Sequence, residues 1–364
     1  YDRLDKRIAF LVEAGMVPCI FGMWGHHLLS MGEDNVRRHW RNLIARYAAY
    51  PVVWAVTGEA ILPEHHTPTE WNRELKTLRD GWRRVARYVR ESDPFRNPMT
   101  AHPPVFDTLK TNPYFCSNGH DLPASASTHD MFPDAQDLFD INMLQTGHLG
   151  YGTLAPHVRW VREAVDGDRK KPVVSGETCY ENIFGASHAD VQRYLFWGTM
   201  FNGAAGVTYG AMGVWNMNSK EAPRDESAGW GEGFWQDTMH LPGSTHVGVG
   251  RKILERYPWW TLRPVEEPCC PETSLSPFSV EGDALKMLYL PSNSMPEPLR
   301  GMMTSEWGTI ARIRLNSDAD WRATFFNPRT GQAVDHGVLR AEPDGFLNAP
   351  GKPSGADWVL LLER

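Results

Sequence analysis

The chain is short of positive charge and of long apolar runs. It has 37 Lys and Arg against 44 Asp and Glu, which gives a formal net charge of −7 and a pI of about 6.1. A chain this acidic lacks the electrostatic footprint for binding nucleic acids or anionic membrane surfaces. No run of about 18 apolar residues occurs, so the sequence predicts no membrane-spanning helix. We therefore expect neither a nucleic-acid partner nor a membrane.

Two cofactor signatures are also missing. The five cysteines are odd in number and form no Cys-x-x-Cys pair, which argues against both a zinc site and a disulfide framework. Cys19 and Cys179 lie in or near predicted strands, and we expect both to be buried thiols. No Gly-x-Gly-x-x-Gly follows a predicted strand, so there is no dinucleotide-binding fingerprint. We expect no cofactor and no metal.

The pattern that is present alternates apolar strands with amphipathic helices. Residues 1–12 carry a helical apolar stripe, and the continuous apolar run at 16–24 predicts a strand buried on both faces. The same pair of elements recurs along the chain. We predict further helices at 33–48, 69–91, 155–165, 188–200 and 248–257, and further strands at 52–56, 99–102, 138–144, 172–175 and 206–210.

Six strand–helix alternations predict a parallel α/β sheet or barrel. Polar residues gather just after successive strands, which favours a TIM (β/α)8-type barrel over residues 1–262. Six strands cannot close such a barrel without exposed edges. We therefore expect the natural protein to extend N-terminally, with the run at 16–24 as strand three, 206–210 as strand eight, and strands one and two missing from this chain.

The composition changes after about residue 265. Four prolines between 264 and 277 mark a linker, and short segments of alternating polarity follow at 284–290, 309–315, 321–326 and 358–362. This pattern predicts a C-terminal all-β sandwich over residues 265–364. We interpret this domain as a brace between domains.

Two carboxylates stand out by their position. Glu59 and Glu177 each follow a glycine at the end of a buried apolar strand. Active sites of (β/α) barrels lie at this end of the strands. The structural alternative is that each carboxylate only forms a salt bridge at a helix cap. This alternative is less favoured because two such glutamates occur, three strands apart and both after a glycine. Glycosidic cleavage needs one acid and one carboxylate that attacks or activates water, and this pair supplies both.

Several segments resemble the apiosidase-like glycoside hydrolases, whose barrel is followed by a β domain named for collagen binding. The resemblance covers nearly the whole chain. Its more specific parts are Arg46-Tyr47 with Pro51 and Trp54, and the Gly-Glu-x-x-Tyr-Glu segment at 176–181. The resemblance implies a retaining mechanism with Glu59 as acid/base and Glu177 as nucleophile. Members often carry Asp where this chain has Glu59, whose side chain reaches one methylene further. The family's known activity removes apiose from plant pectin.

Further polar and aromatic side chains follow the same strand ends. Flat rings suit the C–H faces of sugars, and His, Gln and Tyr suit sugar hydroxyls, although packing and loop hydrogen bonding are alternatives. The expected substrate-binding residues are Trp24, His26, His102, Gln145, His148, Tyr180, Tyr209, Trp215 and Trp235, with Trp230 as a further candidate. His26 and His27 are adjacent, unlike the i, i+4 pair of a helical metal site.

Taken together, these features predict a glycoside hydrolase that cleaves glycosidic bonds in plant or microbial polysaccharide by a two-carboxylate retaining mechanism. Its expected partner is a carbohydrate substrate. For the full-length protein we expect secretion or a periplasmic location. The alternative is a carbohydrate-binding protein without catalysis. Such a protein does not need two carboxylates at the strand ends, so the presence of the pair favours the enzyme.

Overall fold

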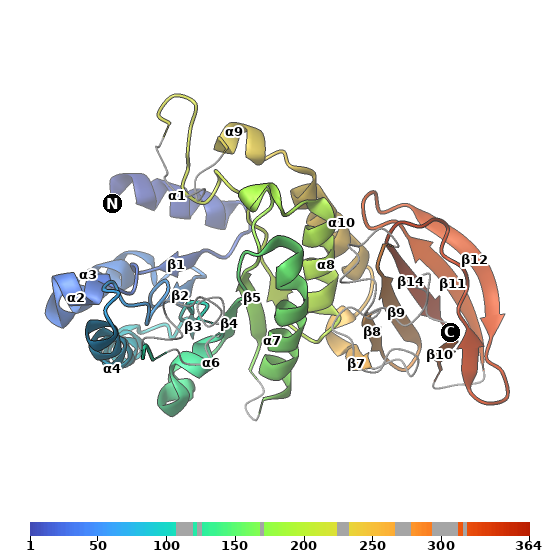
Figure 1. Ribbon diagram of the computed structural model, residues 1–364, viewed down its shortest axis with the longest axis horizontal. Coiled ribbons are helices and arrows are strands. Elements are labelled where there is room, and N and C mark those ends of the chain that lie inside the picture. The colour runs from blue at the N-terminus through green and yellow to red at the C-terminus, as the bar shows by residue number, and fades with distance from the viewer. Residues whose placement is uncertain are drawn as a thin grey trace. The chain divides into compact units, whose positions relative to one another are not determined.

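The computed structural model describes residues 1–106, 119–121, 126–167, 171–223, 233–265, 278–292, 312–315 and 319–364 (Figure 1). The chain is α/β with a C-terminal antiparallel sheet region. It divides into two compact units, Tyr1–Gln145 with Asp168–Gly176, and Thr146–Gly167 with Glu177–Arg364. Over the described ranges, no helix has both the length and the apolar character needed to cross a membrane.

The first unit contains a parallel three-stranded sheet in the order β1-β2-β3. The strands are β1 (Cys19–Phe21), β2 (Val53–Ala55) and β3 (Met99–Thr100). The helices beside them are α1 (Asp2–Glu13), α2 (His27–Met31), α3 (Glu33–Tyr47) and α4 (Pro68–Ser92). The amphipathic helix predicted at 33–48 is confirmed as α3, and its buried residues are Val36, Trp40, Leu43, Ile44 and Tyr47.

Two expectations for the N-terminal region are wrong. Strand β1 is not buried on both faces: Ile20 points into the core, while Cys19 and Phe21 alternate onto an exposed face. The Cys19 thiol therefore belongs to an exposed residue, whereas Cys179 is buried as expected. In α1 only Ile8 of the predicted stripe is buried. The physical reason is that the core covers one side of these elements and leaves the other side open.

The first unit ends with short helical turns and one fully buried strand. After α6 (Thr128–Met131), the 3-10 turn η2 (Pro133–Leu138) occupies the start of the segment predicted as a strand from 138 to 144. Strand β4 (Asn142–Gln145) therefore begins later than predicted. It is the sheet neighbour of β5 (Val173–Glu177), and all four of its residues are buried.

The second unit is built around helix α8 (Ala189–Met200), which is buried along residues 191–199. It packs against α7 (Leu154–Asp166) and α10 (Pro242–Leu254), which lie on either side of it in Figure 1. Shorter elements of this unit are η3 (Gly150–Thr153), η4 (Ile183–Gly185), β6 (Gly206–Val207), α9 (Trp235–Thr238) and η6 (Trp259–Thr261).

An antiparallel six-stranded sheet in the order β12-β11-β14-β9-β8-β7 forms the C-terminal part of this unit. Its strands are β7 (Arg263–Val265), β8 (Phe278–Glu281), β9 (Leu285–Leu290), β11 (Asp320–Phe326), β12 (Ala333–Arg340) and β14 (Trp358–Glu363). One face of this sheet shares a core with α8, where Tyr194 packs on Phe278 and Tyr289. Residues of the other face share a second core with Ile313 and Leu347. These two residues belong to the two-stranded sheet of β10 (Arg312–Arg314) and β13 (Phe346–Asn348).

Candidate active site

In the first unit, Glu59 follows β2, in a segment whose backbone is hydrogen-bonded to residues 23–25, the segment that follows β1. The N–H of Gly25 donates to the carbonyl of Gly58 over 2.7 Å, and the N–H of Gly58 donates to the carbonyl of Met23 over 2.8 Å. A Cβ on Gly58 would lie 2.8 Å from the Trp24 ring, so a side chain at this position would displace the indole from its present place. The next residue, Glu59, has a positive φ of 39°. Such a backbone costs about 1–3 kcal/mol in a residue other than glycine, and this strain is typical of functional positions.

Residues that follow β3 and end β4 bind Glu59 and its neighbours Thr57 and Ala60. The carbonyl of His102 accepts the N–H of Ala60 at 3.1 Å, and the N–H of His102 donates to Thr57 at 3.0 Å. The side-chain amide of Gln145, at the end of β4, donates to Oε1 of Glu59 at 3.4 Å. His102 and Gln145 are both buried. The structure thus brings three predicted site residues, Glu59, His102 and Gln145, together around one turn.

Trp24 and His26 precede α2 on the same turn. Trp24 is 46% exposed although its ring lies against Gly58. The His26 ring meets the His27 ring at 4.3 Å, edge to face. Burial, and then the charge of His27, lower the pKa of His26, so its imidazole is neutral near pH 7. Across the described residues, no group of three or more His, Cys, Asp or Glu is arranged to hold a metal ion.

In the second unit, two side chains converge on Glu177. His148 Nε2 lies 2.8 Å from Oε1 of Glu177, and the Tyr180 hydroxyl donates to the same oxygen at 2.7 Å. Burial alone would lower the pKa of His148, but hydrogen bonds and charge from Cys179 and Glu177 outweigh it and raise the pKa to about 9. His148 is therefore an imidazolium at neutral pH, and its Nε2–H donates to the carboxylate. Glu177 keeps a 16% exposed side chain.

The second carboxylate of this segment, Glu181, has a different environment. It is 2% exposed and accepts the N–H of Gly243, in the first turn of α10, at 3.0 and 3.1 Å. The hydroxyl of Tyr209 donates to its Oε2 at 2.5 Å. A carboxylate at a helix N-terminus satisfies free N–H groups and the helix dipole. Glu181 therefore fastens the segment after β5 to α10, and it holds the hydroxyl of Tyr209, one of the predicted sugar-binding groups.

The remaining predicted aromatic residues lie after β6. Trp215 is 45% exposed. Trp235 is half-buried at the start of α9, where its backbone N–H donates to the carbonyl of Asn218 at 2.8 Å. Trp230 lies outside the described residues.

Sequence reasoning did not assign the role of Glu181 or foresee its partner Gly243. The signal available for Glu181 was its place as the second glutamate of the Gly-Glu-x-x-Tyr-Glu segment. Nothing in the local sequence around Gly243 indicates that its backbone N–H meets a carboxylate from a segment so far away along the chain. The pairing of His148 with Glu177 also needed the structure, since both were proposed to face a sugar.

Comparison with known proteins gives the family. A search of curated proteins gave no match. Among solved structures, one described as a glycoside hydrolase aligns with a TM-score of 0.71 at 18% identity, covering 100% of this chain and 76% of that one. A family 5 glycoside hydrolase from Bacteroides vulgatus ATCC 8482 aligns with a TM-score of 0.72 at 18% identity, covering 100% of this chain and 74% of that one. At this identity they show a shared fold.

The family assignment rests on the sequence itself. Residues 1–261 match the family described as "Apiosidase-like, catalytic domain", which confirms the family that the sequence resembles. That match covers well over half of the chain. The chain belongs to the apiosidase-like glycoside hydrolases, enzymes that hydrolyse glycosidic bonds and therefore take carbohydrates as substrates.

Proposed function

We propose that this enzyme cleaves glycosidic bonds in plant or microbial polysaccharide with retention of anomeric configuration, on a TIM (β/α)8-type barrel. Glu177 is the nucleophile and Glu59 the acid/base. The observation that carries the proposal is the convergence of His148 and Tyr180 on one oxygen of Glu177. A carboxylate that attacks the anomeric carbon has to be ionised and fixed in orientation, and two donors on Oε1 meet both needs.

The charge around Glu177 supports the nucleophile role. A cationic His148, with its pKa near 9, favours the ionised form of the carboxylate throughout the neutral range. Tyr180 adds a second hydrogen bond at 2.7 Å and packs its ring 4.4 Å from the His148 ring. The nucleophile is thus an anion whose orientation is set before substrate arrives, which lowers the cost of reaching the transition state.

The setting of Glu59 supports the complementary role. An acid/base has to exist as a carboxylic acid when the leaving oxygen departs and as a carboxylate when water attacks. Glu59 receives a neutral amide from Gln145, whereas Glu177 receives an imidazolium. A neutral donor stabilises the anion less than a cation does. The amide of Gln145 thus stabilises the anion of Glu59 less than the imidazolium of His148 stabilises that of Glu177.

The aromatic residues supply the binding surface in this proposal. Trp24 and Trp215 each expose nearly half of their side chains beyond strand ends. Such rings stack on the apolar faces of sugars, while buried polar groups such as His102 and Gln145 orient hydroxyls. His26, His148, Tyr180, Tyr209 and Trp235 complete the proposed substrate-binding set, with Tyr209 using its ring because its hydroxyl is held by Glu181.

The test uses Glu177→Gln, Glu59→Gln and Glu163→Gln. Glu163 on α7 has a 64% exposed side chain and is a matched control that should keep full activity. We expect Glu177→Gln to lose at least about 1000-fold in kcat, since a nucleophile is removed. Glu59→Gln should act slowly on substrates with poor leaving groups and much better on activated aryl glycosides, whose leaving groups need little help from an acid.

Stereochemistry decides between mechanisms. NMR of the first product formed by the wild-type enzyme should show retention, and inversion would contradict the proposal. Added azide should restore turnover to Glu59→Gln, giving a glycosyl azide of retained configuration. If it restored Glu59→Gln with inversion, or if Glu177→Gln kept wild-type kcat, the assignment of the two roles would be wrong.

A further inference from the structure

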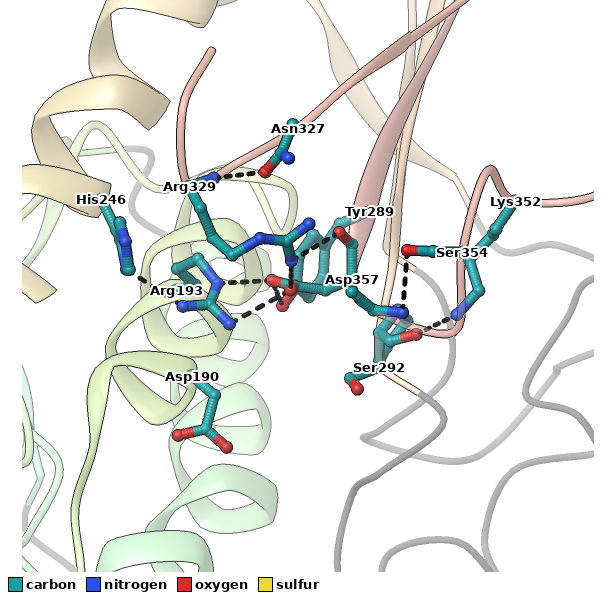
Figure 2. A network of polar contacts seen from close by, with 12 residues as sticks. Asp190, Arg193, His246, Tyr289, Ser292, Asn327, Arg329, Lys352, Ser354 and Asp357 are labelled. Carbon is teal, nitrogen blue, oxygen red and sulfur yellow. Dashed lines mark hydrogen bonds and ion pairs between the residues drawn. The ribbon is translucent and has the colours of Figure 1, made fainter. Parts of the chain in front are cut away.

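A buried carboxylate links the C-terminal sheet to helix α8. Asp357, just before β14, is 2% exposed. It accepts hydrogen bonds from Arg193 Nε at 2.6 Å and Nη2 at 3.1 Å, and from the Tyr289 hydroxyl at 3.0 Å. Arg329, in the turn after β11, adds Nη1 at 2.5 Å. Figure 2 shows these side chains converging on Asp357 from α8, β9 and the β11–β12 turn.

Arg193 extends this link to a second helix. Its Nη1 lies 3.0 Å from Nδ1 of His246 on α10 (Figure 2). A guanidinium only donates, so Nδ1 of His246 accepts and carries no proton. Burial, and then the positive charge of Arg193, lower the pKa of His246, which agrees with a neutral ring. One buried arginine, 8% exposed at its side chain, therefore joins α8, α10 and the start of β14.

The same two helices hold the segment that carries Glu177. Gln192, the neighbour of Arg193 on α8, donates from Nε2 to the carbonyl of Cys179 at 2.8 Å and is 2% exposed. On α10, the N–H of Gly243 binds the carboxylate of Glu181. Residues 177–181 are thus fastened at two points, and both points belong to helices that Arg193 connects to Asp357.

We propose that Asp357 is a positioning residue for residues 177–181, so that the C-terminal sheet is a working part of the catalytic unit and not an appended binding module. This inference rests on the proposed role of Glu177. Asp357 touches no reacting atom; it acts by holding the helices that hold the nucleophile. Because misplacing a reacting group by about 1 Å can cost on the order of 100-fold in rate, the effect falls mainly on kcat; of the proposed substrate-binding residues only Tyr180 lies within residues 177–181.

The test compares Asp357→Asn with Asp335→Asn in the full chain. Asp335 lies on β12 of the same sheet and pairs with Arg322, but both side chains are more than half exposed. Kinetics are measured below the unfolding temperature of each variant, with kcat normalised to the folded fraction from circular dichroism. We expect Asp357→Asn to lower kcat about 10- to 100-fold with KM within about twofold, and Asp335→Asn to change neither.

A second variant covers the case in which Asp357→Asn does not fold. Arg329→Gln removes one donor, from a side chain that is 25% exposed, and leaves the pair of Arg193 and Asp357 in place. It should lower kcat about 3- to 10-fold with KM unchanged. Wild-type kcat per folded molecule in both variants would overturn the proposal. If Glu177→Gln is inactive in that case, the nucleophile assignment stands and only the positioning role fails; an active Glu177→Gln would remove the basis for both.

Discussion

His148 Nε2 lies 2.8 Å from Oε1 of Glu177, and hydrogen bonds and charge from Cys179 and Glu177 together outweigh burial and raise the pKa of His148 from 6.5 to about 9. The imidazolium lowers the cost of ionising the carboxylate. In His148→Gln a neutral amide replaces the cation, so the pKa of Glu177 should rise and the acid limb of the kcat/KM profile should move up by about one pH unit. The measurement is the pH–rate profile of both proteins. His240→Gln, at an exposed position, is the control, and superimposable profiles for His148→Gln and wild type would contradict the expectation.

The exposed tryptophans after the strands should contribute to substrate binding. Trp24→Ala and Trp215→Ala should each raise KM by about tenfold, or about 1.4 kcal/mol, with a smaller change in kcat, since a stacking surface is lost. Trp260 on η6 is 70% exposed and serves as the control. It lies near residues 200–205, which connect the C-terminal end of α8 to β6. Steady-state kinetics on one oligosaccharide checks this. An equal increase in KM for Trp260→Ala would contradict a specific role of Trp24 and Trp215 in substrate binding.

The contact of Glu181 with α10 should be sensitive to a single methyl group. A Cβ on Gly243 would lie 2.3 Å from Oε2 of Glu181, whereas a Cβ on Gly248 of the same helix meets nothing within 4 Å. Gly243→Ala should therefore lower the free energy of unfolding by about 2 kcal/mol. Gly248→Ala should raise it by roughly 0.5–1 kcal/mol, because alanine favours helix over glycine. Urea denaturation measures both, and equal effects of the two substitutions would count against the role of Glu181.

A fully buried histidine should make the fold sensitive to acid. His157 bonds to Thr146 Oγ1 at 2.9 Å and Thr199 Oγ1 at 2.7 Å, and burial lowers its pKa from 6.5 to about 3. The unfolded chain binds the proton more readily than the folded chain below pH 6.5. The free energy of unfolding should therefore fall as pH drops from about 6.5 to 3, by up to about 5 kcal/mol.

The variant His157→Gln checks this assignment. Glutamine does not titrate, so the variant should be less stable at pH 7 but should lose less stability on acidification. Urea midpoints at several pH values are the measurement. A variant whose stability falls with pH as steeply as that of the wild type would show that other groups govern the acid response.

Helix α3 and β1 show how far the sequence predicts local structure. The five apolar positions of α3 recur with helical spacing, and all are buried because one face of the helix meets the core. The apolar run around β1 predicted a strand correctly but not its exposed face, because a continuous apolar run does not reveal which face is covered. Strand β12 was not predicted, since its sequence includes Asp335 and Gly337 and shows little apolar alternation.

The candidate site was predictable in its residue types but not in its pairings. A glutamate after a glycine at a strand end indicated Glu59 and Glu177. The ion pair of Arg193 with Asp357 joins residues 164 positions apart, and no local pattern marks either one. Hydrogen bonds of this kind depend on how helices and sheet pack, which spacing along the chain does not encode.

The close fit of Trp24 against Gly58 has a consequence for the evolution of this family. Any side chain at position 58 would occupy the space of the indole ring, so the two positions should vary together among homologues. A relative with alanine or serine at 58 should therefore carry a smaller residue at 24.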